Sequence, residues 1–487
     1  MDKHPRERVL FFGDMIMRYL GLDIGTTTIT AVVLDVDRGE VVTVQSAVND
    51  AEVTSVEDKQ KGRSEWDGER MIQVAFGVMK QAVDVSGAVD GIGVTGQMHG
   101  MLLVGSDGMS VGSFVGWQDR RGMDVGVGEE TYVGQMRRVS EEMGAFARGC
   151  RPHPGYLGTT LFWLAQQNAL SDGVMASFVP DYAVARLTGM RPVTDATNAA
   201  GSGLFDGVDR VWRVDLIEAL GLAVDRLPEV CESGMRAGAV TQAVADVTGL
   251  KVGTPVCVAC GDNQASFLGS VGDLDNSVLV NVGTGGQVSV HVSDARPTDE
   301  LEARPFVDGG FLLVGAGLVG GRSYAWLRDF LRDVGKTFFG GTGDEDLYEV
   351  MNRLASDVAP GSDGLFCEPL FTGTRREPDR RGVWTGVGTS NFSPGHMGRA
   401  LLEGLTDQFF QLYGEMDRMG VGGRTKLIGA GNGIRKNALL RSILEDRFGM
   451  VMQVPVHREE AAFGAALMGA VSGGEDMTGV GEMIRYV

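Results

Sequence analysis

The feature that most constrains this chain is a short apolar stretch that breaks at a glycine–threonine turn and continues as a second apolar stretch, over residues 20–34. Apolar and β-branched residues on both sides of a tight turn predict two antiparallel strands. Gly25 would let a ligand approach the backbone, and Asp23 could hold a hydrated Mg²⁺. The turn also offers amide N–H groups and three hydroxyls to phosphate oxygens: those of Thr26, Thr27 and Thr28.

The same pattern returns far along the chain. Residues 279–292 again form an apolar strand, a turn containing Gly283, Thr284 and Gly285, and a second strand. The first turn is not a Walker-type loop, because no Gly-Lys-Ser/Thr follows it. Taken alone, it could be a threonine-rich hairpin without a ligand. Two copies in opposite halves of the chain instead predict two similar lobes, whose turns face each other across a cleft and hold one nucleotide.

Length and composition agree with two lobes. A chain of 487 residues is expected to form more than one domain, and its 43% hydrophobic content is enough for two cores. The net charge of −20 argues against nucleic acid or an anionic membrane as a partner. ATP stays compatible with this charge, because amide donors and Mg²⁺ offset the charge of the phosphates.

The beginning of the chain does not read as a signal peptide, because Asp14 and Arg18 interrupt its short apolar run. Residues 1–17 are predicted to be a disordered extension or to reflect an upstream start. No apolar run approaches the length needed to cross a bilayer. The five cysteines have no framework spacing, and a buried strand would point Cys257 and Cys260 to opposite faces. We therefore expect reduced thiols and a cytoplasmic location.

Polar side chains gather after a predicted strand at residues 91–95 and again beside Trp117. Their groups donate or accept hydrogen bonds as a polyhydroxylated ligand requires, and an indole can lie against the C–H faces of a sugar. Alternatively, the histidine has only a structural role and Trp117 belongs to the core. The polar members are Gln97, His99, Gln118 and Asp119.

Two further acidic residues suit chemistry in a cleft. Asp181 lies in the first turn of a predicted helix at residues 179–189, where it could complement the helix dipole or accept hydrogen bonds from sugar hydroxyls. Both interpretations stay open. Asp262 follows a predicted buried strand at residues 256–260, so it could cap the next helix, but its place favours a general base. The boundary between the lobes is expected near residue 250.

A third glycine-rich segment is expected to contact the nucleotide. The predicted strand at residues 426–429 runs into a segment that contains Gly431, Asn432 and Asn437 and opens a helix at residues 438–448. Glycines between a strand and a helix allow a flat base or a ribose to lie against the main chain. Any strand–helix turn can look like this, so the segment is a weaker signal than the two turns.

In this order, the segments resemble the FGGY family of carbohydrate kinases. The resemblance extends from about residue 18 to the end of the chain, and it rests on a combination of motifs that are not specific one by one. The motifs are Asp23-Ile24-Gly25-Thr26-Thr27, Gly96-Gln97-Met98-His99-Gly100, Trp117-Gln118-Asp119, Pro180-Asp181-Tyr182, Gly261-Asp262-Asn263, Gly283-Thr284-Gly285 and the segment from Gly429 to Asn437.

The resemblance implies an α/β fold with two ribonuclease-H-like lobes, of the actin and hexokinase type, around a central cleft. An N-terminal lobe at residues 18–250 would bind the sugar and carry the first phosphate turn. A C-terminal lobe at residues 251–487 would carry the catalytic aspartate, the second phosphate turn and the adenosine site. The implied activity is ATP-dependent phosphorylation of a sugar hydroxyl with Mg²⁺.

The resemblance also implies roles for single residues. Asp262 would accept the proton of the attacking hydroxyl, and Asp23 would position Mg²⁺ through water. The residues that would bind the sugar are Gln97, Met98, His99, Trp117, Gln118, Asp181 and Asn263. The residues that would bind the nucleotide are Gly25, Thr26, Thr27, Thr28, Gly283, Thr284, Gly285, Gly431, Asn432 and Asn437. Gly285 replaces the family's usual serine, which should leave the backbone donors in place.

Within the family, the Gln97-Met98-His99 motif is similar to kinases of xylulose and of sedoheptulose, and Gln118 is closer to the latter. We therefore expect sedoheptulose as the substrate and D-xylulose as the alternative. From another class, an actin-like or chaperone-like nucleotide-gated interaction protein would share the hairpins but would need no sugar-binding residues. The expected partners are a small ketose and MgATP, without nucleic acid or membrane, and a homodimer is left open.

Overall fold

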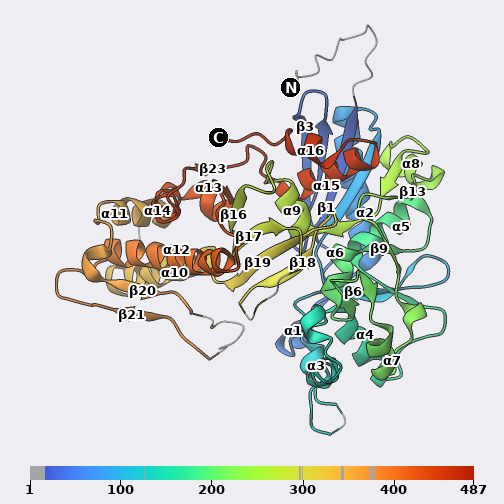
Figure 1. Cartoon of the computed structure of the whole chain (residues 1–487), viewed down its shortest axis with the longest axis horizontal. Coiled ribbons are helices and arrows are strands. Elements are labelled where there is room, and N and C mark those ends of the chain that lie inside the picture. Colours follow the sequence, from blue (N-terminus) through green and yellow to red (C-terminus); the bar gives the residue numbers. More distant parts are fainter. Residues whose placement is uncertain are drawn as a thin grey trace.

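The computed structural model describes residues 17–126, 128–295, 298, 300–341, 345–371, 373 and 379–487, so the expected extension lies outside the described residues except for Met17. The chain forms two lobes, each built on a central sheet (Figure 1). Among the described residues, no helix combines the length and the apolar character that a membrane span requires.

The sheet of the first lobe has the strand order β13-β14-β5-β1-β2-β3, and β15 also pairs with β5. β1 and β2 run antiparallel around the first turn, and β5 runs parallel to β1. The strands are β1 (Arg18–Ile24), β2 (Thr28–Asp35), β3 (Glu40–Val48), β5 (Gly91–Gly96), β13 (Arg236–Ala239), β14 (Pro255–Cys257) and β15 (Cys260–Gly261). The first predicted hairpin is therefore confirmed.

The sheet of the second lobe has the order β18-β19-β17-β16-β22-β23. β16 and β17 run antiparallel around the second turn, and β22 runs parallel to β16. The strands are β16 (Ser277–Val282), β17 (Gly286–Val292), β18 (Glu302–Pro305), β19 (Phe311–Leu318), β22 (Lys426–Ala430) and β23 (Met452–Gln453). The order β14-β5-β1-β2-β3 of the first sheet is repeated by β23-β22-β16-β17-β19 in the second, which confirms the two predicted ribonuclease-H-like lobes.

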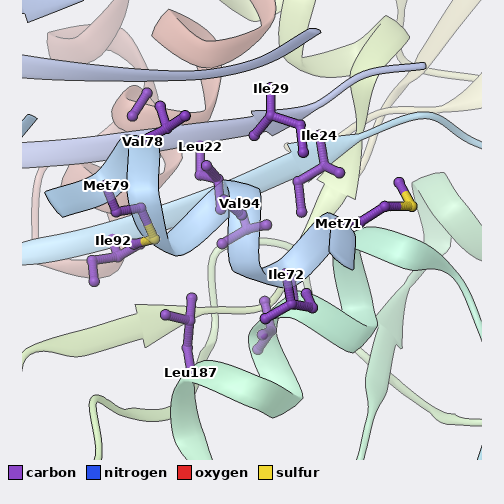
Figure 2. Packing of buried hydrophobic residues seen from close by; sticks show 14 of the residues in the cluster. Leu22, Ile24, Ile29, Met71, Ile72, Val78, Met79, Ile92, Val94 and Leu187 are labelled. Carbon is purple, nitrogen blue, oxygen red and sulfur yellow. The ribbon is translucent and has the colours of Figure 1, made fainter. Parts of the chain in front are cut away.

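An amphipathic helix covers one face of the first sheet. α2 (Gly68–Ser86) begins after Asp67, whose side chain accepts a hydrogen bond from the Arg70 N–H. Apolar side chains of α2, α5 (Val179–Thr188) and the sheet pack against one another (Figure 2). The labelled residues are Leu22, Ile24, Ile29, Met71, Ile72, Val78, Met79, Ile92, Val94 and Leu187. This core supports the strands that carry the first turn.

The last long helix in the chain packs against the first lobe. α15 (Glu460–Ser472) lies on β1 and β5 and packs against α9 (Asp262–Leu268), and Figure 1 shows it in red beside the blue strands. Such close packing requires glycine, because a Cβ at Gly93 would lie 1.8 Å from the Ala465 carbonyl oxygen. The two halves of the chain are thus joined through this small-residue helix.

Strand pairing moves the boundary between the lobes. β14 and β15 both follow residue 250, yet both pair with β5 in the first sheet. The expected boundary at residue 250 is therefore too early, because the strands that lead to Asp262 complete the first sheet. The chain enters the second sheet at β16, after α9.

The remaining elements surround the two sheets. A four-stranded sheet with the order β4-β7-β6-β8 extends the first lobe. The other strands are β4 (Glu65–Trp66), β6 (Met101–Val104), β7 (Ser110–Val115), β8 (Met175–Ser177), β9 (Val193–Asp195), β10 (Phe205–Asp206), β11 (Val211–Trp212), β12 (Glu229–Cys231), β20 (Phe366–Glu368) and β21 (Val383–Thr385). The other helices are α1 (Val56–Gln60), α3 (Tyr132–Glu142), α4 (Leu157–Gln166), α6 (Ala196–Ala199), α7 (Val214–Ala219), α8 (Gln242–Thr248), α10 (Gly320–Phe339), α11 (Leu347–Ser356), α12 (Pro394–Arg418), α13 (Gly431–Lys436), α14 (Ala438–Phe448) and α16 (Met477–Gly481).

Candidate active site

The first turn closes tightly on itself. The Gly25 N–H donates to the Thr28 carbonyl (3.0 Å), and Asn49 Nδ2 donates to the Gly25 carbonyl (2.9 Å). A Cβ on Gly25 would lie 2.8 Å from the Thr28 oxygen, so the turn requires glycine here, and the expected approach of the nucleotide to Gly25 stays a prediction. The amides of Thr26 and Thr27 donate no hydrogen bond within the described residues and stay predicted phosphate donors.

The Thr26 hydroxyl ties this turn to the sugar-binding residues. It donates to Gln97 Oε1 (3.2 Å) and accepts from Trp117 Nε1 (3.4 Å). This hydroxyl is therefore engaged and is not the phosphate donor expected from the sequence, whereas Thr27 and Thr28 are exposed. Gln97 Nε2 is buried without a partner among the described residues, a costly state that a ligand hydroxyl would relieve.

His99 lies just after β5 with a left-handed backbone (φ 76°). Its Nδ1 lies 3.1 Å from the Gly201 carbonyl oxygen, which only accepts, so Nδ1 carries the proton. The ring stacks on Tyr156 with the centroids 4.2 Å apart. Non-glycine residues in this conformation are typical of functional sites. Tyr156 belongs to no motif in the sequence, and we add it to the site because of this stacking.

The other predicted sugar-binding residues near β5 and β7 have different surroundings. Met98 is buried, and a Cβ on Gly261 would lie 2.7 Å from its sulfur, so it packs beneath the strand that leads to Asp262. Trp117 and Gln118 are exposed and available to a ligand. Asp119 is buried and accepts from Arg121 Nε (2.9 Å), so its expected role in sugar binding is wrong.

Asp262 is the first residue of α9, and Gly261 occupies the N-cap position, so Asp262 does not cap the helix. Burial raises the pKa of Asp262 to about 6, against the opposing effects of the Asn263 N–H and the Arg304 guanidinium. A carboxylate with a pKa near neutrality suits a general base. Asn263 Oδ1 accepts from Arg304 Nη1 (3.0 Å), and Arg304 belongs to β18. Both lobes therefore contribute to this site, and the sequence provided no signal for Arg304.

Carboxylates converge on the first turn. Burial, followed by the nearby Asp262 and Glu459, raises the pKa of Asp23 to about 8. Asp23 Oδ1 is buried and has no hydrogen-bond partner among the described residues. Although no preassembled cage of three ligands exists in the described part, this uncompensated oxygen fits Mg²⁺, which usually takes one or two carboxylates together with substrate phosphates.

Glu459 was missed as a site residue. It directly precedes α15, which follows the last strand of the second sheet, just as α9 with Asp262 follows the last strand of the first sheet. This internal repeat is the signal that would have identified it.

Asp181 lies beneath the site. It has no exposed surface, and burial raises its pKa well above the ordinary value. Asn198 Nδ2 lies 3.5 Å from Asp181 Oδ1 and 3.4 Å from the Ala259 carbonyl oxygen, so Asp181 belongs to a polar layer under the strand that leads to Asp262. The carboxyl group has no exposed surface in this structure, and its expected contact with sugar stays a prediction.

The second turn lies between two helix starts. The Gly321 N–H of α10 donates to the Gly283 carbonyl (2.8 Å), and a Cβ on Gly431 of α13 would lie 2.6 Å from the Val282 carbonyl oxygen. Thr284 is exposed beside them. Because helix N-termini favour anions, this arrangement suits phosphate. The start of α10 was not predicted, although its glycine pair was visible in the sequence.

Asn437 has a structural role. Its Oδ1 accepts from the Leu440 N–H (3.0 Å) and thereby caps α14, and the side chain is buried. The cap uses this oxygen, so the predicted contact with the nucleotide would fall to Asn437 Nδ2 and stays a prediction. Gly431 and the exposed Asn432 lie at the opposite end of α13, beside the second turn.

Contacts connect the two turns. Arg435 of α13 forms an ion pair with Glu460 (2.7 Å). The charge of the adjacent Glu459 raises the pKa of Asp23. The phosphate turns, the acidic residues and the sugar-binding residues are therefore parts of one continuous region between the lobes. Such a region can hold a sugar hydroxyl, a base and a triphosphate together.

Known families share this organisation. Residues 18–269 match the N-terminal domain of the FGGY family of carbohydrate kinases, and residues 278–473 match its C-terminal domain. The chain belongs to this family. It is therefore a carbohydrate kinase that uses ATP, and the alternative of a nucleotide-gated interaction protein is wrong.

Relatives of this FGGY kinase differ in their substrates. It is 28% identical to a sedoheptulokinase from Mus musculus, over 92% of this chain and 96% of that protein. It is 27% identical to an autoinducer-2 kinase from Klebsiella pneumoniae subsp. pneumoniae, over 96% of this chain and 88% of that protein. It also superposes on a xylulose kinase from Rhodospirillum rubrum with a TM-score of 0.84 and 25% identity, over 96% of this chain and 93% of the other.

Proposed function

We propose that this kinase transfers the γ-phosphoryl group of MgATP to the terminal hydroxyl of a ketose. Sedoheptulose is the first candidate, with sedoheptulose 7-phosphate as the product. The observation that carries the proposal is the position of Asp262, a carboxylate whose pKa is raised to about 6. It follows the strand that packs on Met98. The next residue, Asn263, accepts a hydrogen bond from Arg304 of the other lobe. D-Xylulose, giving xylulose 5-phosphate, is the second candidate, since a similar structure is that of a xylulose kinase.

The chemistry follows from the arrangement of these groups. The sugar oxygen attacks the γ-phosphorus in line, the bond to the leaving ADP oxygen breaks, and Asp262 takes the hydroxyl proton. The amides of Thr26 and Thr27 and the second turn stabilise charge on the phosphoryl oxygens. Asp23, with Glu459 nearby, would hold Mg²⁺, which when bound neutralises phosphate charge. Gln97, Trp117 and Gln118 hydrogen-bond to or pack against the sugar.

A coupled assay of ADP formation tests the proposal with sedoheptulose, D-xylulose and glycerol as acceptors. We expect the highest kcat/KM for sedoheptulose. A higher value for D-xylulose would transfer the assignment to the second candidate. ATP turnover that is indifferent to every acceptor would contradict a ketose kinase.

The pH dependence of kcat/KM provides a prediction for Asp262. Because the base must be ionised and its pKa is raised to about 6, activity should be lost as the pH falls through that value. The slope should approach tenfold per pH unit below pH 6. A profile measured from pH 4.5 to 8 that stays flat down to pH 5 would contradict the assignment.

A cytoplasmic location is part of the proposal. It is supported by the five cysteines of the described chain, all of which are free, as is typical of reducing compartments. The homodimer stays a prediction.

A further inference from the structure

A large cavity adjoins the candidate sugar site. Its volume is about 1230 Å³, and residues of both lobes line it. On the first-lobe wall, the ring of His153 lies 4.9 Å from that of Tyr156, which stacks on His99. On the second-lobe wall, Glu302 accepts from Arg304 Nε (2.9 Å), and Arg304 donates to Asn263 beside Asp262. Both walls of the cavity therefore include a residue that lies next to a partner of the candidate sugar site.

The arginines on the second-lobe wall are neutralised by their own neighbours. Each of them forms an ion pair with an acidic residue that also lines the cavity. The pairs are Arg380 with Glu368, Arg418 with Glu415, and Arg447 with Asp407. This wall therefore offers little unbalanced positive charge to a ligand.

The arginines on the first-lobe wall differ. Arg137 Nε donates to the Pro152 carbonyl (2.9 Å), and its Nη2 lies 3.4 Å from His153 Nδ1. Arg151 Nε donates to the Phe146 carbonyl (3.3 Å), and its guanidinium lies 5.0 Å from the centre of that ring. Within the described residues neither guanidinium has a carboxylate partner, and carbonyl groups and rings leave the net charge in place.

This imbalance contrasts with the net charge of the protein. The protein carries a net charge of −20, yet two half-buried guanidinium groups face a cavity without acidic partners. The remaining acids of the lining are Glu141, which is exposed on α3, and Glu300 from the second lobe. A negatively charged ligand would balance the positive charge of this wall.

We propose that Arg137 and Arg151, with the adjacent His153, bind an oxyanion carried by a polyhydroxylated chain that extends toward the acceptor site. The planar guanidinium group matches the two oxygens of a carboxylate or a phosphate group. Two sources share this chemistry: an aldonate and a sugar phosphate, either of which would bind with its anion on these arginines and its hydroxyl chain toward the acceptor site. The inference rests on the proposed function, because it extends the same acceptor site.

Isothermal titration without ATP tests the inference, so that it can fail independently of catalysis. The probes are sedoheptulose, sedoheptulose 7-phosphate, D-gluconate and inorganic phosphate. We expect the unsubstituted protein to bind at least one of the two anionic sugars more tightly than sedoheptulose. The Arg137→Gln and Arg151→Gln variants should weaken that binding at least about tenfold and leave sedoheptulose binding unchanged. Whether gluconate or the sugar phosphate responds identifies the source.

Matched variants separate binding from folding. Arg138→Gln removes the same charge from the next residue of α3, which is exposed and paired with Glu130, and it should bind every probe as the parent does. Arg137→Lys retains the charge and should retain part of the affinity. Arg151→Gln makes the test independent of the Arg137 contact with Pro152. Equal affinity of the parent for charged and neutral sugars, or unchanged binding in both glutamine variants, would overturn the inference.

Discussion

The Asp262→Asn variant is expected to lose about a thousandfold in kcat while it still binds the ketose. Asparagine has the same shape but cannot accept the hydroxyl proton. The expected effect on stability has the opposite sign. Because burial raises the pKa of Asp262 to about 6, its ionised form costs folding free energy above that pH, and the neutral amide removes this cost. Steady-state kinetics, calorimetric ketose binding and thermal unfolding at pH 7.5 provide the three measurements.

Asp84→Asn is the matched control. Asp84 is exposed on α2 and paired with Lys80 (2.8 Å), so its substitution should change neither turnover nor binding. Near-normal turnover in Asp262→Asn would remove Asp262 from the role of base. Loss of turnover together with a large loss of stability would indicate a structural role instead.

The Gly93→Ala variant is expected to have the largest effect on stability. The new Cβ would lie 1.8 Å from the Ala465 carbonyl oxygen and 3.0 Å from the Gly469 nitrogen. Both are backbone atoms, so no rotamer change relieves the contact, and α15 must move away from β5. We expect a loss of about 3 kcal/mol in the free energy of unfolding, measured by urea titration. Activity should fall as well, because α15 begins beside Glu459 and Asp23.

Gly77→Ala separates this clash from a general effect of replacing glycine. Gly77 lies in the middle of α2, is exposed, and has nothing within 4 Å of an added Cβ. Alanine should stabilise the helix there by about 0.5–1 kcal/mol. Equal stabilities of the two variants would show that α15 does not pack against β5 at the observed distance.

The local features were predictable because each depends on neighbours in the chain. The two glycine–threonine hairpins and the strand before Asp262 follow from apolar patterns and turn residues close in the sequence. Their repetition was enough to predict two lobes of one topology, and their order was enough to identify the family resemblance. The position of Asp262 at a strand end indicated a base before any contact was known.

Residue roles were less predictable, because several residues near the site make their hydrogen bonds within the protein. Gly25 closes its own turn, Asn437 caps α14, and Asp119 pairs with Arg121. Asp181 stood in a motif of the family, yet it has no exposed surface and its Oδ1 lies 3.5 Å from Asn198 Nδ2. A hydrogen-bonding side chain near a predicted site can serve either purpose, and the choice depends on which partner folding brings within about 3 Å.

The order of residues was sufficient for the strands, the turns and the acid at the strand end, since these depend on interactions over a few positions. Folding of the whole chain assigned Arg304, Tyr156 and Glu459 to the site, because each comes from an element far from the motif it supports. It also set the Asp23 pKa to about 8, as burial and the approach of Asp262 and Glu459 arise from packing between the lobes. Long-range packing changes electrostatics and access, and no local pattern records either.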